Sequence, residues 1–263
     1  GGSERLRVTS AGKIEVKGTR AGALQASDDD TLKLYTASSD NSINRGSGIT
    51  FYNHDNSGYE MGGTIQVAKE NGTADNVAAY MRFSTTPAGG SATERLRIDS
   101  SGQLLLGHAA SRAVGNITSQ MQLEGTDASS GISICRNSNN ASGPYISLAK
   151  SRAGAVGGTT VIQADDAVGS ILFSGADGTD ITNNAASIVA YIDATPGGND
   201  TPGRLTFNTT ADGGTSPTER MRIRANGQVV VNNSDGAYLE MTRTSTNTSG
   251  LCGKIVFGNT DWD

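Results

Sequence analysis

The sequence has few bulky apolar side chains for its length. Leu, Val, Ile and Phe together make up 48 of its 263 residues, a share below the roughly 20% at which disorder becomes a serious alternative. Disordered chains also carry a high net charge, whereas the net charge here is only −5. One chain therefore has too little apolar surface to offset its ordering entropy comfortably. We expect copies of the chain to share one core in a homo-oligomer.

Other absences exclude further classes of protein. The 5 prolines argue against a disordered linker or a collagen helix. The two cysteines, Cys135 and Cys252, cannot form a disulfide framework, and we expect both to be small, buried hydrophobic residues. Because no stretch approaches 18 apolar residues and no signal peptide opens the chain, no membrane insertion is expected. The pI of about 5.1 argues against a nucleic-acid partner.

The most informative feature that is present is a charged, alternating stretch that occurs three times. The copies read SERLRVTSAGKIEVKG at 3–18, SATERLRIDSSGQLLLG at 91–107 and PTERMRIRANGQVVVN at 217–232. The alternation of apolar and charged residues predicts a β-strand. The glycine-containing turn that follows predicts a return strand alongside it. Each copy is therefore a predicted β-hairpin.

The middle copy shows how the hairpin is expected to form. Glu94, Leu96 and Ile98 fall on one face of an extended strand, and the arginines between them fall on the other. Gly102 then fits the left-handed position of a three-residue hairpin loop, and the other copies have a glycine at the same place. A helix is the competing interpretation, but the glycine and the β-branched return strands oppose it.

Two further short units recur around the hairpins. A phenylalanine followed by a Gly-Gly loop precedes two of them, at 83–90 and 207–214. A Gly-x-Ile-x-Val/Phe strand occurs at 63–67, 169–173 and 253–257, with a relative at 48–51. The recurring order predicts repeat units on a β scaffold, with the differences between copies placed in the loops.

These units divide the chain into four predicted parts. Residues 1–18 end one repeat, 19–107 form a second, 108–232 form a third with an insertion near 175–203, and 233–263 begin another. The insertion is inferred from the longer interval between the strand at 169–173 and the next phenylalanine, and it is expected to add a strand or hairpin. Since the first and last parts are incomplete, we expect a segment of a longer protein.

The strings TERLRIDSSGQLLLG and RFSTTPAGG resemble the repeats of bacteriophage tail fibres, in which such hairpins punctuate a β-rich shaft. The match covers the hairpins and their Gly-Gly lead-ins. The resemblance implies an all-β, elongated fibre of short strands and hairpins, built as an intertwined or side-by-side homotrimer. It also implies a virion protein, made in the host cytoplasm, with other tail or baseplate proteins as partners. Its role would be to hold a tip that recognises the host-cell surface, or to contribute to that recognition itself, with surface glycan as a candidate ligand.

Two other functions remain open from the sequence. Some tail spikes degrade polysaccharide, as hydrolases or lyases, with paired carboxylates, and a cellular adhesin can share a β-repeat design. The candidate acids, at 28–30, 165–166, 177 and 180, stand in turn-like contexts where aspartate commonly bonds its own backbone. No P-loop, nucleophile elbow or dinucleotide motif occurs. We therefore predict a structural protein with no enzymatic activity, no catalytic residue and no cofactor.

The arginines of the hairpins have two main interpretations. They can line a solvated face, paired with Glu94, Glu219 or nearby carboxylates in contacts that contribute little. Alternatively, they can reach an adjacent chain and set its register through bidentate contacts, and anion recognition is a minor third possibility. The residues predicted for inter-chain register are Arg95, Arg97, Arg220 and Arg222.

Aromatic residues in loops are candidates for glycan contact, because the apolar face of a sugar stacks on a ring. The densest cluster is FYNHDNSGYE at 51–60, and its predicted contact residues are Tyr52, His54 and Tyr59. The alternative is that these rings pack against the fibre. His54 and His108 have no partner at metal-ligand spacing, so no metal site is predicted.

Overall fold

The computed structural model describes residues 6–8, 14–16, 42–55, 58–128 and 130–232. Every regular element in these ranges is a β-strand, which confirms the predicted all-β class. No helix that could cross a membrane is found in this part of the chain. The further repeat predicted at 233–263 lies outside the described ranges, and so does Cys252.

The chain divides into two compact units, one with residues 1–112 and 118–133, the other with 113–117 and 134–263. The first unit contains a six-stranded sheet, the first sheet. Its strands, in order across the sheet, are β3 (Gly46–Asp55), β4 (Gly58–Lys69), β5 (Ala79–Thr85), β6 (Thr93–Ile98), β7 (Leu104–Leu106) and β8 (Met121–Leu123). Neighbouring strands are antiparallel except β7 and β8, which are parallel.

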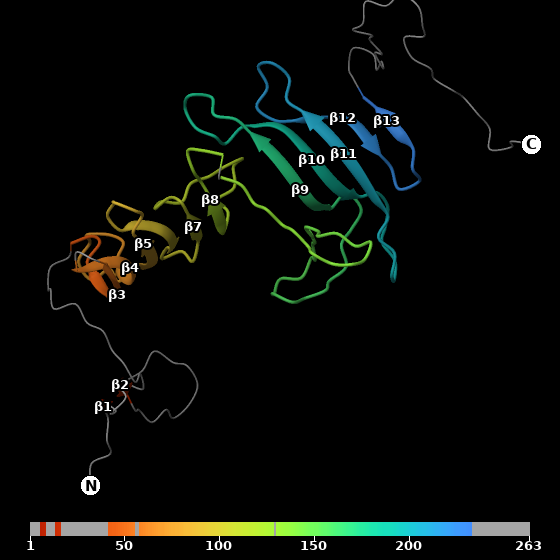
Figure 1. Ribbon diagram of the computed structural model, residues 1–263. Helices are drawn as coiled ribbons and strands as arrows, with labels where there is room; N and C mark the ends of the chain where they lie inside the picture. The colour runs from red at the N-terminus through yellow and green to blue at the C-terminus, as the bar shows by residue number, and fades with distance from the viewer. Residues whose placement is uncertain (1–5, 9–13, 17–41, 56–57, 129, 233–263) are drawn as a thin grey trace, which may run out of the picture. The chain divides into compact units, whose positions relative to one another are not determined.

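The other unit contains a five-stranded antiparallel sheet, the second sheet. Its strands are β9 (Ala167–Ser174), β10 (Asn184–Ile192), β11 (Gly203–Thr209), β12 (Thr218–Ile223) and β13 (Val229–Val231), and they lie side by side in sequence order (Figure 1). A separate pair is formed by β1 (Leu6–Val8) and β2 (Ile14–Val16).

The three predicted hairpins form, and they pair in one register. Their central strand pairs are Arg7–Glu15, Arg97–Leu105 and Arg222–Val230. Gly102 and Gly227 adopt φ angles of +79° and +81°, the left-handed conformation predicted for these turns, in which only glycine avoids strain. The turn of the first hairpin, at 9–13, lies outside the described residues.

The predicted division of the hairpin into an apolar and a charged face is wrong for Glu94. In β6 the register shifts between Glu94 and Leu96, which leaves Arg95 without a partner in the strand ladder. Such a β-bulge interrupts the strict alternation of side chains, so Glu94 shares a face with Arg97 instead of Leu96. A bulge at the same place in β12 leaves Arg220 outside the ladder.

The strand register also corrects the correspondence between the Gly-x-Ile motifs. The matching rows across the two sheets are Ile49–Ile65–Phe83 and Ile171–Ile188–Phe207. The motif at 169–173 therefore occupies the place of 48–51, and not that of 63–67. Because β10 is the counterpart of β4, the strand expected near 175–203 has an equivalent in the first sheet. The predicted repeat boundaries themselves stay a prediction.

One face of each sheet, its apolar face, carries mostly large hydrophobic side chains. The register assigns Ile49, Ile65, Val67, Met81, Phe83, Leu96, Ile98, Leu104, Leu106, Met121 and Leu123 to this face of the first sheet. It assigns Ile171, Phe173, Ile188, Leu205, Phe207, Met221, Ile223, Val229 and Val231 to that of the second. Ile49 is 45% exposed and Ile171 52%. A single chain therefore leaves apolar side chains of both faces in contact with solvent.

The opposite face of each sheet, its mixed face, holds the most deeply buried side chains. Tyr80 is 1% exposed and Leu105 0% on the first sheet, and Thr206 is 1% exposed on the second. Arg97 is also buried on this face, beside Tyr80. A single chain thus buries the more polar face of each sheet and exposes the more apolar one, which reverses the usual arrangement of an isolated globule.

Residues 130–164 form no strand with any other described part of the chain. Their sequence nevertheless alternates as strands do, and the apolar residues Ile132, Ile134, Ile146 and Leu148 are all exposed. Cys135 is exposed as well, so the prediction that it is buried is wrong. The physical reason is that its segment alternates like a strand but is covered by no strand among the described residues.

Candidate functional site

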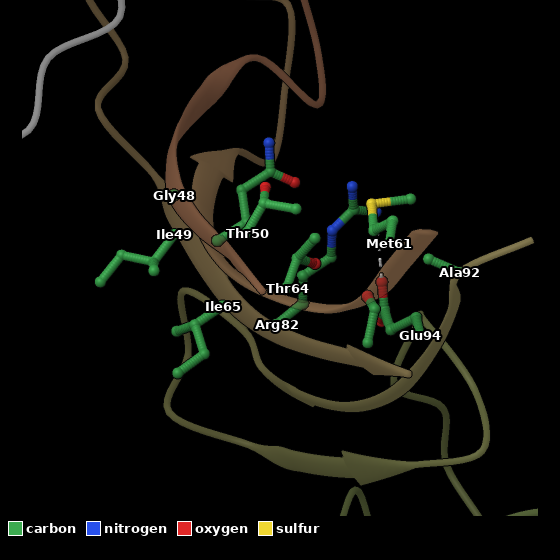
Figure 2. Close-up of a pocket in the computed structure, with 11 residues that line it drawn as sticks. Gly48, Ile49, Thr50, Met61, Thr64, Ile65, Arg82, Ala92 and Glu94 are labelled. Carbon is green, nitrogen blue, oxygen red and sulfur yellow. Dashed lines mark ion pairs between the residues drawn. The ribbon is translucent and has the colours of Figure 1, made fainter. Parts of the chain in front are cut away.

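A polar pocket of about 370 Å³ opens on the mixed face of the first sheet. The side chains that line it come from β3 to β6, and the main ones are Thr50, Met61, Thr64, Gln66, Arg82, Ser84 and Glu94. Figure 2 shows Arg82, Met61 and Glu94 gathered together, whereas the Ile49 and Ile65 side chains point away from them. This division follows from strand alternation, because the two isoleucines belong to the apolar face.

The carboxylate of Glu94 is bound by Arg97 in bidentate fashion. Oε1 accepts the Nε–H of Arg97 at 2.7 Å, and Oε2 accepts an Nη2–H at 2.8 Å. The Arg97 guanidinium also lies over the ring of Tyr80, 3.7 Å from its centroid. The hydrogen bonding to Glu94 raises the pKa of Arg97, against the opposing effect of burial. The charges of Glu94 and Arg97 therefore neutralise each other.

Arg82, the second arginine near Glu94, is less well satisfied. Its Nη1 lies 3.6 Å from Glu94 Oε2, which is beyond hydrogen-bond distance. Its Nε is buried and has no hydrogen-bond partner in the described chain. Since Arg97 already neutralises Glu94, Arg82 gives the pocket surplus positive charge.

The second sheet has the same strand architecture without an arginine at this place. The residue at the register position of Arg82 is Thr206, as shown by its pairing with Arg222 where Arg82 pairs with Arg97. Thr206 is buried, and its hydroxyl donates to the carbonyl of Val189 at 3.3 Å. The bulged sheet therefore forms without a guanidinium at this position, and Arg82 is a feature of the first sheet alone.

Arg82 could not be selected from its own sequence context. It stands in the strand before a Gly-Gly loop, where no catalytic or binding motif marks it. The one available signal was the difference between the two lead-ins, MRFSTTPAGG and LTFNTTADGG, which have Arg82 and Thr206 at the same place. That difference becomes meaningful only when the register shows the two positions to be equivalent.

The four arginines predicted to set inter-chain register each have a partner in their own chain. Arg97 and Arg222 bind the glutamate three residues earlier. Arg95 and Arg220, at the bulges, each donate from Nε to a threonine hydroxyl of the neighbouring strand, at 2.9 and 3.0 Å. These contacts position the side chains within one chain, and a role in register between chains stays a prediction.

The predicted glycan-contact residues lie on the same face as the pocket. Tyr52 pairs with Met61, and His54 with Tyr59, and Tyr52 follows Thr50 by two residues, which places both on one face. Tyr52 is 62% exposed and Tyr59 77%, and the His54 and Tyr59 rings meet edge to face with centroids 5.0 Å apart. The rings are open to solvent beside the pocket, and their contact with a glycan stays a prediction.

The described aspartates considered as catalytic acids serve ion pairs and turns. The guanidinium of Arg152, 2.7 Å from both carboxylate oxygens, and then a backbone amide hold the pKa of Asp166 well below its usual range. The backbone amide of Asp180 and other amides of the turn lower the pKa of Asp177. Both carboxyl groups are therefore ionised at neutral pH and hold no proton to donate. Residues 28–30 lie outside the described ranges.

Replacing Asp166 with asparagine is expected to loosen the junction between residues 150–166 and β10. The amide of Ile192 donates to the carbonyl of Asp166, and that of Asp165 to the carbonyl of Ile192. We expect hydrogen exchange of both amides to accelerate about tenfold at pH 7, because the charged hydrogen bonds to Arg152 are lost. Asp212→Asn, in an exposed loop of the same unit, is the matched control and should leave them unchanged.

The same junction has a defined acid response. Because the pKa of Asp166 is lowered in the folded state, its contribution is fully present above the unfolded value near 3.9 and is lost as pH falls through the lower folded value. As the pH is lowered, hydrogen exchange of the Asp165 and Ile192 amides in the unmodified chain should stay slow until the pH is below 3.9. Loss of their protection while the pH is still above 5 would contradict this assignment.

Histidine and acidic residues form no metal centre in the ranges that the structure describes, where no three His, Cys, Asp or Glu side chains lie close enough to hold an ion. His54 faces Tyr59, and His108 Nδ1 lies 2.9 Å from the carbonyl oxygen of Ala110.

The fold is similar to that of solved phage fibre domains. The chain resembles the carboxy-terminal domain of the bacteriophage T5 L-shaped tail fibre, with a TM-score of 0.66 and 18% identity, over 88% of this chain and 99% of that chain. The form of that domain with its intra-molecular chaperone domain matches with the same TM-score and identity, over 92% of this chain and 69% of that chain. The sequence matches no protein-family model and no curated protein. At this identity the likeness shows the fold alone.

Proposed function

We propose that this chain is a structural and adhesive segment of a phage tail fibre, in which three copies assemble through their apolar sheet faces. Two independent lines support this function. The fold is similar to that of a tail-fibre domain, and the hairpin sequences resemble those of fibre shafts. The role is non-enzymatic, located in the virion, and linked to other tail or baseplate proteins.

The observation that carries the proposal is the exposure of the apolar faces. Both sheets of a single chain leave large hydrophobic side chains in water, including Phe51 at 52% exposure and Phe173 at 50%. Contiguous apolar patches of this kind mark association surfaces. A second and a third copy present the same faces, so like surfaces can cover one another around a common axis. The number three is taken from the resemblance to tail fibres.

The segment 130–164 supports sharing of structure between copies. Its strand-like alternation and exposed isoleucines fit a strand whose partner lies in another chain. Once another copy covers this segment, its backbone N–H and C=O groups need partners, and that copy can supply them. The bulge arginines Arg95, which is exposed, and Arg220, which is half-buried, remain candidates for register contacts at such a boundary.

Sedimentation of the 263-residue chain tests the assembly. We expect a single species with three times the 27.0 kDa chain mass at micromolar concentration, and loss of that species only together with the β-sheet signal on heating. A stable, folded species with the mass of one chain at the same concentration would overturn the proposal.

A further inference from the structure

We propose that the pocket on the mixed face of the first sheet binds an acidic saccharide, whose carboxylate pairs with Arg82. This inference deepens the proposed adhesive function, and it rests on that function in one respect. If the apolar faces are the inner faces of the assembly, the pocket on the mixed face of the first sheet remains open to solvent.

The charge of the pocket selects an anionic group. Arg82 and Glu94 are the charged residues among those that line it, but both oxygens of Glu94 are already occupied by Arg97. The buried Nε of Arg82 has no acceptor within the described chain. A carboxylate that entered the pocket would meet the guanidinium of Arg82, a group suited to binding carboxylates.

The rest of the lining suits a sugar ring better than a bare anion. Thr50, Thr64 and Ser84 contribute hydroxyl groups and Gln66 an amide, which can donate to and accept from sugar hydroxyls. A few placed polar groups in a concave site are the usual means of fixing a ligand's orientation. The pocket volume of about 370 Å³ lies within the range of small-molecule sites, roughly 300–1,000 Å³.

An aromatic surface continues from the pocket along the β3–β4 hairpin. Tyr52 and Met61 are paired across the strands, and Met61 lines the pocket. The exposed rings of Tyr52 and Tyr59 can stack on the apolar faces of further sugar units of a longer chain. The site therefore has a charged end at Arg82 and an aromatic extension.

Comparison of the two sheets indicates that the fold does not require an arginine at position 82. The second sheet reproduces the bulge and the glutamate–arginine pair with Thr206 in place of Arg82. Its Thr206 makes a hydrogen bond inside the sheet, whereas the Nε of Arg82 is buried without an acceptor. Arg204 of the second sheet also has a buried Nε without an acceptor, but its Nη groups pair with Asp165 and Asp193. The bulged sheet therefore forms without an arginine at this register, which leaves ligand binding as the role we assign to Arg82.

The test is a saturation-transfer NMR titration of the full chain with sodium glucuronate, with glucose as the neutral sugar and acetate as the bare carboxylate. We expect glucuronate to bind at least tenfold more tightly than either control probe. Equal binding of glucose would overturn the role of charge, and equal binding of acetate would overturn the role of the sugar. Because this comparison uses the unmodified chain, it does not depend on any variant folding.

A second arm assigns the binding to the pocket. Arg82→Thr, which installs the residue found at the same register in the second sheet, should weaken glucuronate binding at least tenfold and leave the melting temperature unchanged. Arg112→Thr, which removes an arginine that pairs with Glu124 outside the pocket, should bind normally. Unchanged binding by Arg82→Thr would overturn the site.

The outcome of the glucuronate titration can be distinguished from the outcome of the sedimentation experiment. Sedimentation as three chains without glucuronate binding would reject the pocket and retain the fibre. Arg82-dependent binding by a chain that sediments alone would retain the pocket and reject the assembly.

Discussion

Replacing Ile65 with glutamate is expected to separate the assembled copies, whereas the same replacement of its neighbour Thr64 should leave them together. The two residues are adjacent in β4, are both half-buried in a single chain, and differ mainly in the face they occupy. Ile65 stands on the apolar face between Ile49 and Phe83, and Thr64 stands on the mixed face. If the apolar face meets other copies, only the charge at position 65 enters a dry interface.

The expected size of this effect is large because each copy carries the change. Loss of a buried isoleucine removes about 2 kcal/mol of transfer free energy, and burial of an unpaired carboxylate adds a further penalty. Over three copies the first contribution alone is about 6 kcal/mol, or roughly a factor of 10⁴ in the association constant. Sedimentation at several concentrations measures it. If Ile65→Glu and Thr64→Glu dissociate the assembly equally, or if neither variant dissociates it, the assignment of the apolar face is contradicted.

Replacing Arg97 with methionine is expected to lower the free energy of unfolding of the first unit by about 3 kcal/mol. The side chains of Arg97 and Glu94 are 10% and 18% exposed, so the substitution leaves a poorly hydrated carboxylate with Arg82 at 3.6 Å as its nearest remaining cation. It also removes the guanidinium stacked on Tyr80, a contact of about 1–2 kcal/mol when desolvated. Urea denaturation followed by circular dichroism measures the change.

Arg95→Met is the matched control for Arg97→Met. Arg95 lies two residues away in β6, is exposed, and makes a single hydrogen bond to Thr85, so its loss should cost about 1 kcal/mol or less. A comparable cost for both variants would show that the bidentate pair does not stabilise the unit. Dissociation of the assembly by Arg95→Met without a change in unfolding would support the predicted role of this arginine between chains.

Local patterns were enough to predict the class of the fold. The alternation in TERLRI and TERMRI and the glycine four residues beyond it predicted the β-hairpins, because a two-residue period and a left-handed turn are properties of short segments. The low content of large aliphatic residues predicted that one chain cannot complete its core. The open apolar faces are the structural counterpart of that deficit.

The candidate site could not be predicted in the same way. Arg82, Gln66 and Glu94 are separated along the chain and meet only because β4, β5 and β6 pair in one register. The aromatic residues Tyr52 and Tyr59 were selected from composition, but their position beside the pocket depends on the pairing of β3 with β4. Pairing between strands is not encoded in any one segment.

The sequence by itself determined that this protein is built from β-hairpins with glycine turns, and that it is poor in core-forming side chains. Tertiary structure alone decided which face Glu94 occupies. The bulge at Arg95 adds one residue to one strand, and since side chains alternate with a period of two, it moves Glu94 across the sheet to Arg97. That transfer buries the ion pair and, together with the strand register, brings Arg82 and Glu94 to one pocket.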